Sequence, residues 1–257
     1  MSDLDFVRTA GPKQSEHDQD HSGPRLNSRS VVDPSMSQYY MADEKVFPAG
    51  VYSRAPVFGV LSEMNMRSKF DAPFILDRIR TLSLSSRTQI RYCDLNDLSD
   101  LSDLSEVVDP NGGNNGKDGA SVDRRFLEEH VGVLLALYTR LNTDFSPDFS
   151  TREMQVVLRS KSWVLAKSSN DTNQHLYCTR ECRPESEAVL IGDQMPHSVF
   201  KFNNKDLIHC MGWDEPPPLN KVLAHFLKMI DRLATEAVSD KDAFAFYEIY
   251  CHLLERT

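Results

Sequence analysis

The stretch MQVVLRSKSWVLAKSSNDTNQHLYC, residues 154–178, decides the fold that the sequence predicts. Its apolar residues fall into three short runs, and runs rich in Val, Leu, Trp and Tyr are typical of strands. We predict strands over Met154–Arg159, Ser162–Lys167 and Gln174–Cys178. A two-residue polar turn joins the first pair, and the polar segment 168–173 has the composition of a hairpin loop. The stretch therefore predicts an antiparallel meander.

Helical patterns lie on both sides of this meander. A helix is predicted over 121–141, because a mostly apolar set recurs at helical spacing: Phe126, His130, Val133, Leu134, Leu137 and Leu141. Two more amphipathic helices follow the proline run 216–218. The first carries one apolar face made of Leu219, Val222, Leu223, Phe226, Ile230 and Leu233, and the second carries Phe244, Tyr247, Cys251 and Leu254. Helices gathered beside an antiparallel sheet predict an α+β fold.

Shorter patterns complete the predicted domain. Pro73 can occupy the first turn of a helix whose apolar positions are Phe74, Ile75, Ile79 and Leu82. Strands are predicted at Val57–Leu61 and Gln89–Cys93, and weaker ones at Ala188–Ile191 and Val199–Phe202. We therefore expect an antiparallel sheet of about five strands packed with helices.

The N-terminal segment has a different composition. Residues 1–45 are rich in Gly, Pro, Ser, Asp and His, so their burial cannot offset the entropy of ordering them, and we predict a disordered arm. Its one apolar point, Tyr39–Met41, either docks on a partner or stays solvated. Residues 46–257 are predicted to form a single α+β domain. An acidic and Gly/Asn-rich insert at about 95–120, which contains three Asp-Leu-Ser repeats, interrupts this domain.

Overall composition excludes several classes of function. The 257 residues carry a formal net charge of -9, which argues against binding to nucleic acid. The five scattered cysteines are an odd number and do not suggest a disulfide framework, so a reducing compartment is expected. No secretory signal, lipidation motif or long apolar run is visible. We expect a cytoplasmic or nuclear protein.

The candidate metal ligands are His175, Cys178, Cys182, His209 and Cys210. The spacing of Cys178 and Cys182 is permitted in zinc sites. His209 and Cys210 are adjacent, and neighbouring side chains of a strand point to opposite faces, which disfavours a shared ion. These cysteines can equally be small buried hydrophobic residues. Because no local catalytic signature surrounds them, the sequence predicts no catalytic residue, no metal and no cofactor.

Several of these elements resemble a known family. An N-x-D-F element at 142–145, W-V-x-x-K-S at 163–168 and L-Y at 176–177 follow the order found in the C-terminal longin-type domain of the Ccz subunit of the Mon–Ccz complex. The resemblance covers about residues 89–178. It implies a longin-like fold and no catalytic residue.

The resemblance also implies a function and partners. Proteins similar to Ccz form half of a heterodimeric guanine-nucleotide exchange factor for a late-endosomal Rab GTPase. The expected partners are therefore another longin-domain subunit and a Rab-type GTPase, with recruitment to endosomal membranes through these partners alone. We expect a non-catalytic scaffold or binding subunit in vesicle trafficking.

The apolar strands of the predicted meander suggest where a partner binds. The predicted partner interface consists of Met154, Val156, Trp163, Leu165 and Tyr177. Two alternatives stay open at this point. The chain can be an unrelated α+β adaptor that acts through its disordered arm, or an enzyme that depends on cysteine and histidine.

Overall fold

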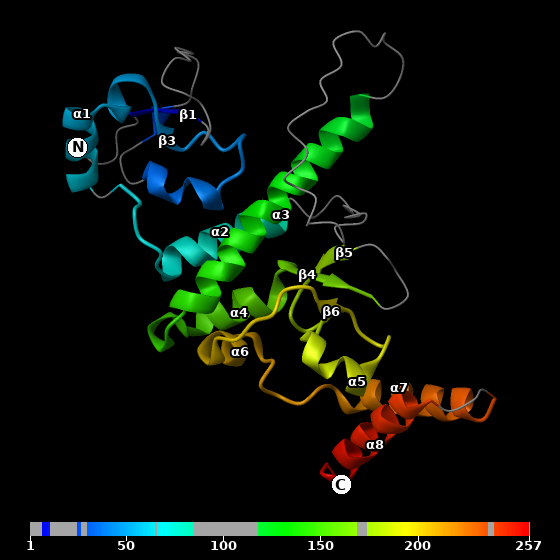
Figure 1. Cartoon of the computed structure of the whole chain (residues 1–257). Coiled ribbons are helices and arrows are strands. Elements are labelled where there is room, and N and C mark those ends of the chain that lie inside the picture. The colour runs from blue at the N-terminus through cyan, green and yellow to red at the C-terminus, as the bar shows by residue number, and fades with distance from the viewer. Residues whose placement is uncertain are drawn as a thin grey trace. The chain divides into compact units, whose positions relative to one another are not determined.

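The computed structural model describes residues 7–10, 25–26, 30–64, 66–84, 118–168, 174–235 and 239–256 (Figure 1). The chain divides into two compact units, each of which is described by itself. Unit 1 comprises Met1–Arg78 and Val122–Thr139, and unit 2 comprises Ile79–Ser121 and Arg140–Thr257. The predicted strand Gln89–Cys93 and the Asp-Leu-Ser repeats lie outside the described residues.

Unit 1 contains a small sheet and a short helix. Its elements are β1 (Val7–Ala10), β2 (Arg25–Leu26), β3 (Phe47–Pro48) and α1 (Ala55–Glu63), with 3-10 turns at Pro34–Tyr39 and Gly50–Ser53. The strands are antiparallel in the order β2-β1-β3. Val7, Val31, Leu61 and Met66 form the apolar core beside this sheet.

The Tyr39–Met41 segment is buried in unit 1. The Tyr39 ring lies 5.5 Å from the Phe74 ring, and the Tyr40 ring lies 5.3 Å from the Phe47 ring. The prediction of a disordered arm was therefore wrong for residues 30–45, because aromatic partners outside this segment supply the burial that its own composition lacks. Most of the remaining arm lies outside the described residues.

A buried ion pair stabilises the same region. Arg78 is 1% exposed and donates two hydrogen bonds to the Glu44 carboxylate, at 2.7 and 2.6 Å. The Arg78 guanidinium also lies 4.1 Å from the centre of the Tyr40 ring. The ion pair with Glu44 and the contact with the Tyr40 ring together offset the free-energy cost of removing the guanidinium from water.

Two long helices contribute to both units. They are α2 (Ala72–Leu84) and α3 (Asp118–Asp144), and both were predicted from their periodicity. The predicted strand Val57–Leu61 was wrong, since these residues lie in α1, where Pro56 occupies the first turn. Proline fixes its own φ at a helical value and needs no backbone hydrogen-bond donor there, so it favours a helix start.

Unit 2 contains the predicted hairpin. Strands β4 (Val164–Lys167) and β5 (Gln174–Tyr177) pair in antiparallel register, with Leu165 opposite Leu176. The third strand, β6 (His197–Ser198), pairs with the other edge of β4, giving the order β5-β4-β6. The strand predicted at Val199–Phe202 is displaced toward the N-terminus, and Val199 N–H makes one more bond to Leu165 O before the chain turns away.

The first predicted strand of the meander is a helix instead. Residues Arg152–Ser160 form α4, and the Thr151 side chain accepts a hydrogen bond from Met154 N–H at its start. Met154, Val157 and Leu158 are buried, while Val156 is exposed. This spacing is the helical one, so capping and periodicity outweigh the strand preference of two adjacent valines.

The C-terminal half of unit 2 is helical. It contains α5 (Ala188–Ile191), α6 (Lys205–Met211), α7 (Leu219–Leu233) and α8 (Asp240–Leu254), and a 3-10 turn at Glu185–Glu187 precedes α5; another 3-10 turn, Pro147–Phe149, precedes α4. The predicted strand Ala188–Ile191 was therefore wrong. The segment continues a 3-10 turn and stops at Gly192, whose φ of 52° and close approach to the His225 ring leave no room for a side chain.

Residues of α5, α7 and α8, together with Met195 of the turn after α5, form one core cluster. Its buried members are Ile191, Met195, Val222, Met229 and Ile249. Helices and antiparallel sheets together make the protein α+β, as predicted. None of the described helices combines the length and apolar character that crossing a bilayer requires.

Candidate functional site

The predicted interface residues are divided between core and surface. Met154 and Trp163 are fully buried, and Leu165 is 2% exposed. Tyr177 is half-buried on β5, and Val156 is exposed on α4. Three of the five residues thus build the core of unit 2, and a partner can reach only Val156 and Tyr177.

The candidate metal ligands do not converge. Cys182 Sγ lies 3.4 Å from Cys178 O, Cys210 Sγ lies 3.0 Å from Ser150 Oγ, and His209 Nδ1 lies 2.6 Å from Asp214 Oδ2. Across the described part of the chain, no three His, Cys, Asp or Glu side chains are placed to hold a metal ion. The reading of these cysteines as small buried residues fits their surroundings better.

Burial also opposes thiol chemistry. It raises the pKa values of Cys178, Cys182 and Cys210 above the usual thiol range. A nucleophilic cysteine needs the opposite shift, because the thiolate is the reactive form. These three thiols therefore stay protonated at neutral pH.

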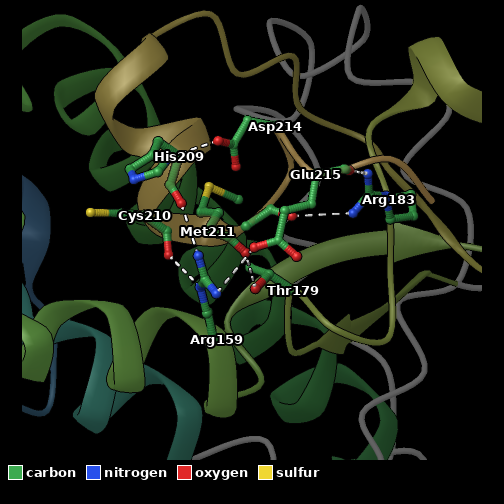
Figure 2. Close-up of polar contacts among 9 residues, drawn as sticks. Arg159, Thr179, Arg183, His209, Cys210, Met211, Asp214 and Glu215 are labelled. Atoms are coloured by element: carbon green, nitrogen blue, oxygen red, sulfur yellow. Dashed lines mark hydrogen bonds and ion pairs between the residues drawn. The ribbon is translucent and has the colours of Figure 1, made fainter. Parts of the chain in front are cut away.

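The most elaborate polar cluster surrounds the C-terminus of α6 (Figure 2). A helix leaves its last carbonyl groups without partners inside the helix. Here Arg159 of α4 donates to His209 O at 3.1 Å and to Cys210 O at 2.9 Å. Thr179 Oγ1 donates to Met211 O at 2.9 Å, and the chain leaves the helix through Gly212 at a φ of 76°.

Arg183 adds a second layer to this cluster. Its guanidinium donates to Gly212 O at 3.3 Å and Glu215 O at 2.5 Å, and it pairs with the Glu187 carboxylate at 2.7 and 2.8 Å. Trp213 Nε1 donates to Thr179 O and Cys182 O. These bonds tie the segment after α6 to the turn after β5.

His209 and Asp214 form a pair at the edge of the cluster (Figure 2). The hydrogen bond from His209 holds the pKa of Asp214 below its usual value. Such a pair orients an imidazole for acid–base work only if a reacting group lies beside the other ring nitrogen. His209 is exposed, and the adjacent Cys210 side chain contacts Ser150 instead. The pair is therefore an exposed hydrogen bond between an imidazole and a carboxylate at the surface of unit 2.

A second candidate site is the outer face of α8, which we define as Phe244, Tyr247, Tyr250 and Leu254. These side chains are between 48% and 62% exposed. Ile249, which is fully buried, lies about 160° around the helix from Tyr247. The helix thus buries one apolar face against α5 and α7 and presents a second, largely aromatic one to solvent.

Helix α7 has a narrower exposed flank. Val222 and Met229 are buried, while the neighbouring apolar positions Leu219, Leu223, Leu227 and Ile230 are exposed. From the sequence we predicted a single apolar face that joins buried and exposed positions, because neighbouring apolar stripes on a helix share the same spacing. The exposed fractions of the side chains separate the two stripes.

Comparison with known proteins identifies no relative. The chain matches no protein-family model, no curated protein and no solved structure. The function must therefore be inferred from the described surfaces themselves.

Proposed function

We propose that this chain is a non-catalytic protein-binding subunit whose main contact surface is the outer face of α8. The observation that carries the proposal is the largely aromatic stripe of α8, which has Tyr247 at its centre, 62% exposed. Clustered exposed apolar side chains mark interaction sites, and aromatic residues are enriched in protein interfaces.

The size of the outer face suits a protein partner. Half-exposed Phe and Tyr side chains leave about 100 Å² each, so the four residues present roughly 400 Å² of apolar surface. Because about 57% of a non-obligate interface is apolar, this corresponds to about 700 Å² on one partner. A standard interface buries about 800 Å² per partner.

The charges beside the outer face favour a protein over a membrane. Helix α8 carries three acidic residues, Asp240, Asp242 and Glu248, against a single basic one, Lys241. Helices that lie on anionic membranes carry Lys and Arg on their polar face instead. The expected partner is therefore an apolar helix of another protein with basic residues along its flanks.

The test compares two variants of the full chain. Tyr247→Asp should abolish partner capture without changing stability, because the ring is largely exposed, while the control Lys241→Ala should retain the partner. The captured protein is then purified and titrated against both variants by calorimetry. A partner that binds Tyr247→Asp as tightly as wild type would refute the role of this face. If wild type is a dimer and Tyr247→Asp is a monomer, the outer face of α8 binds a second copy of this chain and not another protein.

A narrower form of the proposal follows from the sequence resemblance. In it the chain has longin-like packing, pairs with another longin-domain subunit and serves a Rab-type GTPase at endosomal membranes. The hairpin β4–β5 and the helix α3 support this form, and the helix α4 speaks against it, since the sequence predicts a strand of the meander there. A sheet of about five strands would require two strands beyond β4, β5 and β6 of unit 2.

Nucleotide release measures this narrower form directly. A purified longin-domain partner together with this chain should accelerate release of a fluorescent guanine nucleotide from a Rab-type GTPase. If the pair forms but release stays at the intrinsic rate, the binding role survives and the exchange role does not.

A further inference from the structure

Beside the C-terminus of α6, unit 2 has a hollow of about 230 Å³ with an unusual lining. Three arginines and one glutamate contribute to it, together with Thr179, Met211, Gly212, Pro216 and Pro218. Sites for small-molecule ligands usually occupy about 300–1,000 Å³. The hollow is therefore of a size for a charged group and not for a cofactor.

The three arginines differ in how far their charges are compensated. Arg183 is buried, and Glu187 neutralises it through two short bonds. Arg159 donates to two neutral backbone carbonyls, and among the described residues its one carboxylate partner is Glu215, 3.7 Å away. Arg180 is exposed, and its guanidinium makes no hydrogen bond or ion pair with the described residues.

Glu215 is a loosely held counter-ion. Its side chain is 69% exposed, and 3.7 Å is longer than a charge-assisted hydrogen bond. Figure 2 shows Glu215 next to Arg159 and Arg183, on the segment that follows α6. An incoming anion can take its place at Arg159 at small cost, because an exposed ion pair contributes little.

We propose that this hollow binds a phosphate monoester, held between Arg159 and Arg180 after Glu215 has moved aside. Two incompletely compensated arginines match the charge of about -1.5 to -2 that a phosphate monoester carries at neutral pH. Guanidinium groups also match the geometry of phosphate oxygens. The proposal does not depend on the outer face of α8.

The test is calorimetric titration of the full chain in chloride buffer with three probes. Inorganic phosphate and a phosphoserine peptide should both bind, and the unphosphorylated peptide should not. If the phosphoserine peptide binds more tightly than inorganic phosphate, the natural ligand is a phosphorylated protein side chain. Arg180→Ala should weaken phosphate binding about tenfold, with the same urea midpoint as wild type. Glu215→Gln should strengthen binding severalfold, because it removes the competing carboxylate.

A matched control lies on the same helix as Arg159. Arg152 is exposed on α4 but does not line the hollow, so Arg152→Ala should bind phosphate as wild type does. Equal weakening by Arg152→Ala and Arg180→Ala would mean unspecific attraction and overturn the proposal. Wild type that binds no phosphate, or that binds the unphosphorylated peptide equally well, would also overturn it.

Discussion

Replacing each of the two adjacent valines of α4 by alanine tests whether residues 152–160 form a helix. Val157 is 5% exposed and Val156 is 56% exposed. In a helix the two positions lie about 100° apart, one facing the core and the other facing solvent. In a strand, Val156 would instead share a face with Met154 and Leu158.

The two substitutions should change the stability of unit 2 in opposite directions. Val157→Ala removes two buried methyl groups at about 0.8 kcal/mol each and leaves a small cavity, so unit 2 should lose about 2 kcal/mol. Val156→Ala removes a β-branched residue from an exposed helix position and should stabilise by roughly 0.5 kcal/mol. A strand would make the second change destabilising, because valine favours strands and alanine does not.

Tryptophan fluorescence during urea unfolding is the assay. The protein has two tryptophans, Trp163 and Trp213, and both are buried in unit 2, so the signal reports on this unit. Trp163 Nε1 donates to Leu158 O at 2.9 Å, which couples the probe to the end of α4. A Val156→Ala variant that loses 1 kcal/mol or more, with Val157→Ala near wild type, would refute the helix.

Three further predictions concern stability. Gly212→Ala should cost unit 2 about 2 kcal/mol, because a Cβ at a φ of 76° is strained and would lie 3.0 Å from Arg159 Cζ; urea midpoints should show a smaller cost in an Arg159→Ala background. Glu44→Gln should destabilise unit 1 by about 3 kcal/mol in circular-dichroism melts, because it leaves the buried Arg78 charge without its carboxylate partner. Burial lowers the pKa of His225 below 6.5, so its contribution to stability is complete above pH 6.5 and is lost as pH falls through the folded-state pKa. The urea midpoint should therefore drop in acid, and His225→Gln should reduce that drop.

Local sequence patterns predicted the long elements and the central hairpin. The helices α2, α3, α7 and α8 have strong apolar periodicity, and β4 and β5 flank a polar loop, so chemistry within each segment suffices to specify them. The segment α4 was misread because Val156-Val157 resembles a strand. Thr151, three residues before the first buried position, was the available signal for a helix start.

Other features depend on contacts that no local pattern contains. Tyr39 and Tyr40 are buried because Phe74 and Phe47 pack against them, and the composition of residues 1–45 gives no sign of this. The cluster at the end of α6 likewise joins Arg159 to carbonyl groups about 50 positions later in the chain. Every residue has a backbone carbonyl, so the residue types in the sequence do not reveal which carbonyl groups Arg159 binds.

The two faces of α8 are the strongest support for the proposed binding role. Roughly 400 Å² of apolar surface left in water forgoes about 10 kcal/mol of hydrophobic stabilisation, before the costs of binding are counted. A partner helix would recover part of that free energy. Among the described residues of unit 2, α5 and α7 contact the opposite face of α8, around Ile249. The buried thiols show the reverse pattern, since their surroundings hold them protonated. Exposed apolar surface on α8 thus favours association, whereas burial disfavours the reactive thiolate form of Cys178, Cys182 and Cys210.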